Sequence, residues 1–194
     1  MSGEFRKDLA RMLDAVGPSR RRRLAFVLLN SELHCVACFR FGQYSIRARR
    51  ARSPVWLPAA IVYRLWNRWC THLHHCGIDP RAQIGPGFLL IHRTGITIGP
   101  IVAGRDFTIY HNVTIGMRVA GNDQGIPRFG DRVWLGPGAN VSGAVSIGDG
   151  TAIGAGSVLS KSVPDRVLVA GNPARVIATN YDNGSMVNSP VDAP

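Results

Sequence analysis

The chain has 194 residues, of which 45% are hydrophobic, and a formal net charge of +11 at pH 7. This length and composition are typical of one compact domain or two small ones, and they exclude a chain dominated by low-complexity sequence. The charge is uneven: residues 1–75 hold fourteen Arg or Lys and four Asp or Glu, whereas the later residues hold nine and eight. A basic N-terminal region indicates an anionic partner such as nucleic acid, a membrane surface or an acidic protein. Because no segment resembles a nucleic-acid-reading module, we expect no nucleic-acid partner.

Residues 1–76 are predicted to form a helical region. Apolar residues recur at helical spacing over residues 4–16, and the Gly-Pro pair at 17–18 ends this first helix. The next helix starts with four arginines at 20–23 and continues through the apolar run 24–29, so positive charge lies at the helix end where the macrodipole disfavours it. An anionic partner would relieve this repulsion, and a solvated basic face is the alternative interpretation.

Two longer helices complete the helical region. The first runs through residues 33–44 into the basic stretch 47–52, and the second runs from residue 59 to about residue 73 after Pro58. The second helix is too short and too charged to span a membrane, and it combines aromatic with basic residues: Tyr63, Trp66, Trp69, Arg64 and Arg68. Such side chains suit a peripheral contact with a bilayer, and they equally suit packing against the rest of the protein or another subunit.

The four cysteines fall into two groups in the sequence. Cys35 and Cys38 form a C-x-x-C pair, and Cys70 and Cys76 lie in a His-rich stretch. Thiolates and imidazoles are the usual ligands of zinc, but neither group has a recognised partner spacing, so we predict no metal site. Residues 1–16 lack the apolar segment of a signal peptide, so we expect reduced thiols in the cytoplasm. A membrane contact would place the protein at the inner face of the membrane.

Residues 129–163 repeat with a period of six. An apolar residue opens each block and is usually followed by Gly, and the openers are Phe129, Leu135, Val141, Ile147, Ile153 and Leu159. Because a strand alternates its faces every second residue, a six-residue unit of strand and turn returns one side chain to the same inward position each time. Three such blocks close a triangular coil, and stacked coils bury a ladder of aliphatic residues. An ordinary β-meander, the alternative, would not keep this register.

The repeat extends towards the N-terminus with irregularities. Its openers there are Ile78, Ile84, Leu90, Val102 and Ile109. The register slips around residues 95–100, and residues 117–128 break the repeat and are predicted to leave the coil as a loop. We therefore predict a mainly β fold, with a parallel β-helix over residues 77–178 after the helical region and a flexible polar tail over residues 179–194.

Four short motifs accompany the repeat: Ile-His-Arg-Thr-Gly-Ile at 91–96, Val-Thr-Ile-Gly at 113–116, Ile-Gly-Ala-Gly-Ser-Val at 153–158 and Ala-Gly-Asn-Pro-Ala-Arg-Val-Ile at 170–177. Together they resemble the hexapeptide acyltransferase superfamily, and within it the serine acetyltransferase branch. The resemblance implies a left-handed parallel β-helix, acetyl-CoA as the acyl donor, and a homotrimer or a dimer of trimers. The left hand comes from the resemblance alone, since the spacing supports only the coil.

His92 is the predicted catalytic base. The resemblance implies that it removes the proton of the acceptor hydroxyl while this oxygen attacks the thioester of acetyl-CoA, a task that suits a neutral imidazole. Without the motif, a surface or packed histidine would be the ordinary interpretation. The family has an Asp fifteen residues before the His to orient it, and this position is Gly77 here. Asp79 is the predicted substitute, although it is offset by one strand step of about 7 Å.

The acceptor pocket is predicted around His111, Arg93 and Ile126. The block spacing places His92 and His111 on the same face of successive coils, and because neighbouring coils lie about 4.8 Å apart we expect the two residues to be near neighbours. In the alternative interpretation, His111 only belongs to an exposed ladder. The family's serine contacts, an Asp before the catalytic His and an Asp-Arg-His before a proline, appear here as Ile91 and residues 124–126, which are Gln-Gly-Ile. Apolar replacements leave the charges of a zwitterion unpaired, so we predict a neutral hydroxyl compound rather than serine.

The resemblance places coenzyme A along the later coils, where small residues let the pantetheine approach backbone amides. The predicted contacts of this kind are Gly136, Gly154, Ala155 and Gly156. The predicted phosphate contacts are Lys161, Arg166 and Arg175. In the alternative interpretation, the glycines serve only the corners of the coil.

We therefore predict a cytoplasmic, acetyl-CoA-dependent O-acetyltransferase that acts on a sugar or exopolysaccharide unit, closest to the polysaccharide-biosynthesis O-acetyltransferases. Two alternatives stay open: a divergent serine O-acetyltransferase of cysteine biosynthesis, and a non-catalytic β-helix scaffold whose basic N-terminal region docks on a partner. His92 and the coil glycines favour an enzyme, and Gly77 in place of the Asp favours the scaffold.

Overall fold

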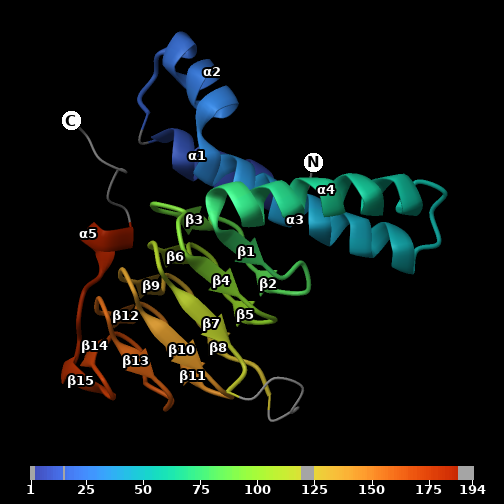
Figure 1. Ribbon diagram of the computed structural model, residues 1–194. Coiled ribbons are helices and arrows are strands. Elements are labelled where there is room, and N and C mark those ends of the chain that lie inside the picture. The colour runs from blue at the N-terminus through green and yellow to red at the C-terminus, as the bar shows by residue number, and fades with distance from the viewer. Residues whose placement is uncertain (1–2, 15, 119–124, 188–194) are drawn as a thin grey trace.

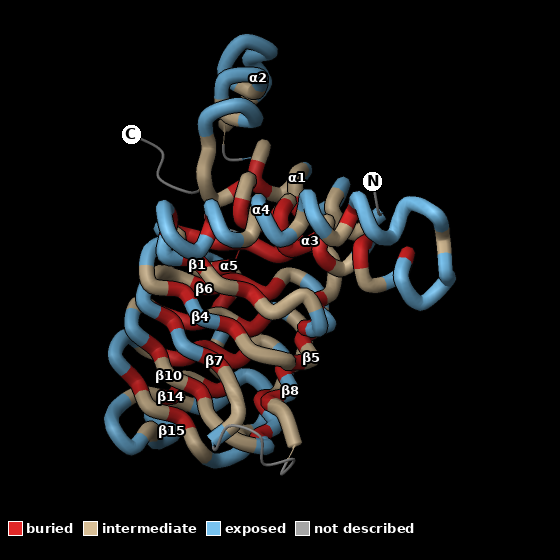
Figure 2. The backbone as a smooth tube through the Cα atoms, turned by 45° about the vertical axis from the view of Figure 1, so that its right-hand side comes forward, coloured by how far each residue is buried: buried red, intermediate tan, exposed pale blue. Residues whose placement is uncertain are grey.

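The computed structural model describes residues 3–14, 16–118 and 125–187. A group of helices covers one end of a parallel β-solenoid, and the solenoid extends from it to a C-terminal hairpin (Figure 1). Buried residues run through the stacked coils and continue up to the helices, as Figure 2 shows. The predicted architecture, a helical region followed by a parallel β-helix, is therefore confirmed.

The helical region consists of α1 (Gly3–Asp14), α2 (Arg20–Leu29), α3 (Ser31–Arg50) and α4 (Trp56–His74), close to the four predicted helices. The Asn30 side chain accepts a hydrogen bond from the Leu33 amide and so caps α3. His75 has a left-handed φ of 49° and ends α4. The long helices α3 and α4 pack against each other, whereas α2 buries none of its residues.

A buried ion pair joins the helical region to the first coil. Arg40 of α3 donates to both carboxylate oxygens of Asp8 of α1, at 2.8 and 3.2 Å, and both residues are buried. Asp8 also accepts hydrogen bonds from the amides of Gly87 and Phe88. Buried charges are tolerated only when they are paired and hydrogen-bonded, and this cluster links α1 and α3 to the first coil.

The solenoid is a triangular coil with three parallel sheets as its faces. Sheet A contains β1 (Cys76–Ile78), β4 (Ile96–Ile98), β7 (Thr114–Gly116), β10 (Asn140–Ser142) and β13 (Val158–Leu159). Sheet B contains β2 (Gln83–Ile84), β5 (Val102–Ala103), β8 (Arg128–Phe129) and β11 (Ser146–Ile147). Sheet C contains β3 (Leu89–Leu90), β6 (Thr108–Ile109), β9 (Trp134–Leu135), β12 (Ala152–Ile153), β14 (Leu168–Gly171) and β15 (Ala174–Ala178). Among the described residues, the paired strands run parallel except β14 and β15, which form the antiparallel hairpin.

The block openers form the predicted aliphatic ladders. In sheet C, Leu90 pairs with Ile109, Ile109 with Leu135, and Leu135 with Ile153. Each of these four side chains is at most 1% exposed. Burying an aliphatic side chain of this size contributes roughly 1.5–3 kcal/mol, so the stacked coils provide their own core.

The register slip lies at the corner after β3. Eight positions separate the inward residues Leu90 and Ile98, whereas six separate Ile109 and Ile115 in the next coil. The two additional residues therefore belong to residues 91–95, earlier than predicted. This is the corner that holds the predicted base, so the irregularity of the repeat marks the site. After β4 the register shortens by one residue before β5, where Ala103 and not the predicted opener Val102 is buried and pairs with Ile84.

The predicted excursion loop lies between β7 and β8. Strand β7 ends at Gly116 and β8 begins at Arg128, so these consecutive strands are separated by the predicted loop segment. Residues 119–124 of this segment lie outside the described residues. The loop therefore starts and ends at the corner between sheets A and B.

The prediction of a flexible tail is wrong for residues 179–187. The Tyr181 amide donates to the Arg166 carbonyl at 2.7 Å, and Asn183 is 1% exposed. A short helix, α5 (Gly184–Val187), follows. This segment packs along the solenoid because its backbone and the Asn183 side chain find hydrogen-bond partners there, and residues 188–194 lie outside the described residues.

Candidate active site

Each coil has three corners, which we name AB, BC and CA after the sheets that they join. The CA corner follows each parallel strand of sheet C. Several predicted site residues lie at this corner on successive coils, namely His92 after β3, His111 after β6, Gly136 after β9 and Gly154 after β12. The column formed by these CA corners is the candidate active site.

His92 and His111 are neighbours on this column, as their spacing predicts. Their ring centroids lie 5.7 Å apart, and the Tyr110 ring packs against His92 with centroids 6.3 Å apart. His92 is exposed and has a left-handed φ of 55°. His111 is half-buried, and its Nδ1 atom has no hydrogen-bond partner among the residues that the structure describes. The column thus presents one exposed imidazole beside a more sheltered one.

The residues after His92 hold its corner in shape. The Asn112 amide donates to the Thr94 carbonyl at 2.8 Å. Gly95 has a φ of 74°, and a Cβ atom there would collide with the Asn112 Oδ1 atom. Glycine is therefore required at this turn, which carries His92 outward without disturbing the aliphatic ladder.

The structure corrects the prediction that Asp79 orients His92. Strand β1 runs from the CA corner to the AB corner, so Asp79 follows the end of the strand that is remote from His92, whereas Gly77 lies nearer. Arg81 donates to both carboxylate oxygens of Asp79, with its shortest contact at 2.7 Å. Burial raises the pKa of Asp79, but the hydrogen bonds from Arg81 outweigh burial and lower it below its usual value. This carboxylate is engaged at another corner.

Arg93 follows His92 in the sequence but turns towards the helical region. Its guanidinium group forms an ion pair with Glu32 of α3 at 3.4 Å, and its Nε atom is buried without a partner in the described part of the chain. Burial lowers the pKa of His74, and the nearby charge of Arg93 lowers it further. Arg93 therefore ties the His92 corner to the helices, and the geometry does not support the predicted substrate contact.

The two apolar residues predicted near the acceptor lie apart from each other. Ile91 is buried with Met12 and Leu33, so it packs against the helical region. Ile126 is half-buried at the AB corner, two residues before β8 begins, and Gln124 lies outside the described residues. Within one chain, Ile126 and His92 therefore belong to different corners.

Small residues continue the CA column beyond His111. A Cβ atom at Gly136 would lie 2.9 Å from both the Ala155 amide nitrogen and the Trp134 ring, so this packing requires glycine. Gly156 has a φ of 65° and open space where a Cβ atom would be. The predicted pantetheine contacts Gly136, Gly154, Ala155 and Gly156 thus share one column, where a long ligand can approach the backbone.

The three predicted phosphate contacts lie at different places. Arg175 is exposed in β15 and pairs with Ala170, near the CA corner. Lys161 is exposed at the AB corner after β13, and Arg166 is exposed at the BC corner with a φ of 53°. Of the three, only Arg175 adjoins the glycine column in the same chain.

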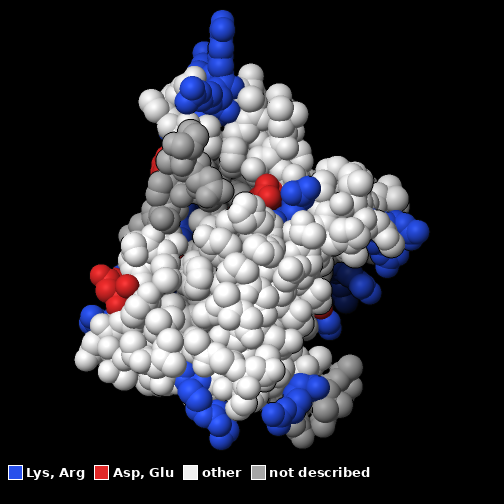
Figure 3. Space-filling model, turned by 60° about the vertical axis from the view of Figure 1, so that its left-hand side comes forward, with Lys and Arg blue, Asp and Glu red and all other residues white. Residues whose placement is uncertain are grey.

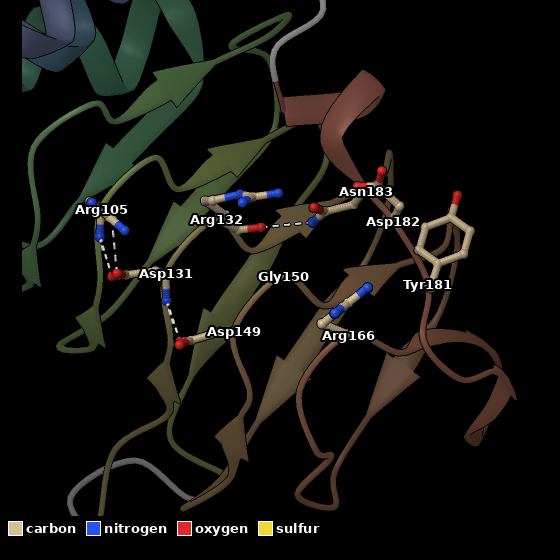
Figure 4. Close-up of a pocket in the computed structure, with 9 residues that line it drawn as sticks. All are labelled: Arg105, Asp131, Arg132, Asp149, Gly150, Arg166, Tyr181, Asp182 and Asn183. Atoms are coloured by element: carbon tan, nitrogen blue, oxygen red, sulfur yellow. Dashed lines mark hydrogen bonds and ion pairs between the residues drawn. The ribbon is translucent and has the colours of Figure 1, made fainter.

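Arg166 instead lines a pocket of about 350 Å³ at the BC corner (Figure 4). Arg105 and Arg132 reach the same pocket from earlier coils, and Asp131 pairs with Arg105 at 3.0 Å. Asn183 donates to the Arg132 carbonyl, and its buried Oδ1 atom has no partner among the described residues. Arginines of this kind can hold an anion, but the pocket lies on another corner than His92.

The two cysteine groups of the sequence form one buried cluster. Its members are Cys35 and Cys38 of α3, Cys70 of α4 and Cys76 of β1, each at most 3% exposed. Hydrogen bonding with Cys70, together with burial, raises the pKa of the Cys35 and Cys38 thiols. Over the described ranges, no group of three or more His, Cys, Asp or Glu side chains is arranged to hold a metal ion. The thiols therefore pack as part of the core between the helices and the first coil.

Tyr110 and Trp134 pack beside the histidine pair but were not among the predicted site residues. Their ring centroids lie 5.3 Å apart, and the Trp134 Nε1 atom is buried with no partner in the described residues. Tyr110 directly follows β6, and Trp134 is the first residue of β9, the neighbouring strand of sheet C. The sequence could have indicated both residues, because the repeat places them on the same sheet as the strand that precedes His111.

The chain is similar to several known proteins. A family model described as bacterial transferase hexapeptide (six repeats) matches residues 127–161. Serine acetyltransferase 3, mitochondrial, of Arabidopsis thaliana is 37% identical over 154 residues, which cover 76% of this chain and 38% of that relative. Serine acetyltransferase of Helicobacter pylori is 30% identical over 174 residues, which cover 88% of this chain and 96% of that relative.

A solved structure supports the same relationship. The crystal structure of serine acetyltransferase in complex with coenzyme A from Brucella abortus strain S19 aligns with a TM-score of 0.75 at 29% identity, and covers 91% of this chain and 67% of that chain. The chain spans less than half the length of the plant relative but nearly all of the Helicobacter relative, so the similarity extends well beyond the repeat. The chain belongs to the serine acetyltransferase family of hexapeptide-repeat transferases.

Proposed function

We propose that this chain transfers the acetyl group of acetyl-CoA to the hydroxyl group of L-serine. The observation that carries the proposal is the His92–His111 pair at one end of a column of small residues. The similarity to the Helicobacter serine acetyltransferase covers 96% of that relative and supports the same activity. The Brucella relative, solved with coenzyme A, supports acetyl-CoA as the donor. These relatives favour serine over the sugar unit that the sequence analysis placed first.

His92 acts as the general base in this proposal. Its imidazole accepts the proton of the acceptor hydroxyl as that oxygen bonds to the thioester carbonyl carbon. The carbon–sulfur bond then breaks, and the imidazolium returns the proton to the departing sulfur, so that coenzyme A leaves as a thiol. The exposed position of His92 leaves it accessible to the acceptor, and His111, with its ring 5.7 Å away, is placed to contact that acceptor.

We further propose that neighbouring copies in a trimer complete the site. His92 lies at the CA corner and Lys161 and Ile126 lie at the AB corner, so these residues flank sheet A from opposite sides. In a cyclic assembly, contacts between copies are head-to-tail and join different surfaces of identical chains. Such contacts can bring the AB corner of one copy against the CA corner of the next, which supports a shared site.

A neutral hydroxyl compound such as a sugar unit is the second candidate acceptor. The observation that favours it is the absence of the family's polar serine contacts, since these positions hold the buried Ile91 and the half-buried Ile126. The charged groups of serine would need other partners there, because an unpaired charge in a closed site is unfavourable by several kcal/mol.

The test is thiol release from acetyl-CoA with L-serine and with a panel of neutral sugars. We expect turnover with serine that falls by roughly 10²-fold or more in His92→Asn, because asparagine tolerates the left-handed backbone but is no base. His72→Asn is the matched control, since His72 is exposed on α4. Turnover with a sugar and none with serine would replace serine by the second candidate. A protein that binds no coenzyme A would favour the scaffold interpretation.

A further inference from the structure

Exposed apolar side chains are concentrated in the helical region. Of the fifteen large hydrophobic residues that are exposed in the described part of the chain, thirteen lie between residues 24 and 73, and the other two lie in β15. Proteins that act as single chains rarely expose large contiguous apolar patches. These residues therefore mark a surface that the chain leaves uncovered.

Helix α2 contributes the first part of this surface. It buries none of its residues, and Figures 1 and 2 both show it projecting from the helical region, away from the solenoid. Leu24, Leu28 and Leu29 are 61%, 63% and 79% exposed. Four arginines form its first turn with no acidic residue beside them, although the macrodipole disfavours positive charge there. Figure 3 shows basic atoms at the tip of this helix.

Helix α4 contributes the second part. Seven of its large apolar residues are exposed, and five of them recur every four positions, so each of these five lies beside the next along the helix: Leu57, Ile61, Leu65, Trp69 and Leu73. Each of these five side chains is between 42% and 66% exposed. The charged residues of α4 are Arg64 and Arg68, and its sequence contains no Asp or Glu. Helix α4 therefore exposes apolar and basic side chains together and carries no acidic side chain.

The acidic residues of the helical region do not neutralise this surface. Three of the four acids in residues 1–75 already form ion pairs with Arg40 or Arg93: Glu4, Asp8 and Glu32. The fourth is Asp14. The arginines of α2 and α4 therefore outnumber the acids available to them, and two copies of this face brought together would repel each other.

We propose that α2 and α4 form a face that docks on a lipid bilayer containing anionic lipids. The leucines of α2 and the exposed apolar side chains of α4 enter the boundary between headgroups and acyl chains, while the arginines extend to the lipid phosphates. The docking is peripheral: no single described helix meets the length and composition of a membrane span, and α2 and α3 meet them only together, with a bend of 64° between them. The proposal is independent of the acetyl acceptor.

The test is co-flotation of the full chain with vesicles. Vesicles of phosphatidylcholine alone are compared with vesicles that contain roughly one-third phosphatidylglycerol, at low and at high salt. We expect retention by the anionic vesicles at low salt and release at high salt, because salt screens exposed charges. Replacing residues 20–23 by glutamine should lower the partition coefficient by about fivefold per arginine. Leu24→Gln with Leu28→Gln should also weaken retention, and the fold should persist because α2 buries nothing.

Val176→Gln with Ile177→Gln is the matched control, since it removes two exposed apolar side chains of β15, which are 44% and 60% exposed, and should leave retention unchanged. The alternative is that a second copy of the chain covers this face. Sedimentation velocity of the double variant Ile61→Gln with Leu65→Gln tests it by measuring the mass of the assembly. A smaller mass for this variant, together with no retention of the wild type by anionic vesicles, would overturn the proposal. Equal retention by neutral and anionic vesicles, or no effect of the arginine replacements, would overturn it as well.

Discussion

The solenoid buries its apolar side chains in successive coils, whereas α2 and α4 leave many of theirs in contact with solvent. Ile109, Leu135 and Ile153 are fully buried because each coil covers the next one. The helical region has no repeat of this kind and is joined to the first coil by specific contacts such as the Asp8–Arg40 pair. The solenoid, which carries the candidate active site, therefore buries its apolar side chains within the chain. Helices α2 and α4 leave apolar side chains exposed on their outer surface, where a partner can bind.

The largest expected effect concerns the chemistry of the solenoid. Replacing His92 by asparagine removes the proposed base, and we expect the turnover number to fall by roughly 10²–10⁴-fold. His92 is exposed, so the free energy of unfolding should change by less than about 0.5 kcal/mol, and vesicle retention should stay as in the wild type. Thiol-release kinetics and urea unfolding measure both quantities. Unchanged turnover would move the base to another residue.

A second change breaks the link between the two regions. Asp8→Ala leaves Arg40 buried without its main partner and removes an acceptor from the amides of Gly87 and Phe88. Removing one partner of a buried ion pair is strongly destabilising, so we expect a loss of about 3–5 kcal/mol in the free energy of unfolding. Chemical denaturation followed by tryptophan fluorescence measures it, since three tryptophans lie in α4 and Trp134 lies in the solenoid.

Asp14→Ala is the matched control, because Asp14 is an exposed acid on the same helix. We expect it to stay within about 0.5 kcal/mol of the wild type. If Asp8→Ala were equally stable, the buried pair would contribute little net stability, and the helices would owe their position to apolar contacts.

The sequence predicted the solenoid because its repeat is local. A period of six maps each residue to one face or corner, so the ladders and the closeness of His92 and His111 followed from spacing alone. The predicted position of the register slip was less accurate, because the two additional residues lie at a corner, where no apolar spacing fixes the register. Serine as the better-supported acceptor came from relatives rather than from the pattern.

Other features depend on contacts between distant segments, which spacing does not reveal. Arg93 pairs with Glu32, a residue 61 positions earlier, and this pairing links it to α3. The four cysteines meet only because α3 and α4 pack as a hairpin on β1. The prediction that Asp79 orients His92 was wrong because β1 runs away from the His92 corner. Each step along this strand therefore increases the distance from His92.

A third prediction compares the two regions at matched side chains. Leu135→Ala leaves a cavity in a fully buried ladder and should lower the free energy of unfolding by about 2–5 kcal/mol. Leu28→Ala changes a side chain that is 63% exposed on α2, and we expect a difference within about 0.5 kcal/mol. Urea denaturation of both variants measures the contrast. A large loss for Leu28→Ala would show that α2 is covered in solution, as in an assembly of copies.

The smallest expected effect concerns an exposed ion pair of the solenoid. The Asp79 pKa lies below its usual value because the hydrogen bonds from Arg81 outweigh the effect of burial. A depressed carboxyl pKa stabilises the folded state above the unfolded value of about 3.9, and this contribution is lost as the pH falls through the lower folded value. Since the Arg81 side chain is 67% exposed, Asp79→Asn should lower the free energy of unfolding by only about 0.2–1 kcal/mol at neutral pH.

This difference between wild type and Asp79→Asn should disappear when urea unfolding is measured well below about pH 3.9, because both proteins then carry an uncharged group at position 79. A difference that grows in acid would contradict the direction of the pKa shift. Turnover of the variant should stay near that of the wild type, because Arg81 engages both carboxylate oxygens of Asp79 and so occupies this group in an ion pair. A loss of turnover comparable to that of His92→Asn would instead place this carboxylate in the active site. Because Asp79 lies at the AB corner, it would then reach the reacting groups from a neighbouring copy in the proposed trimer.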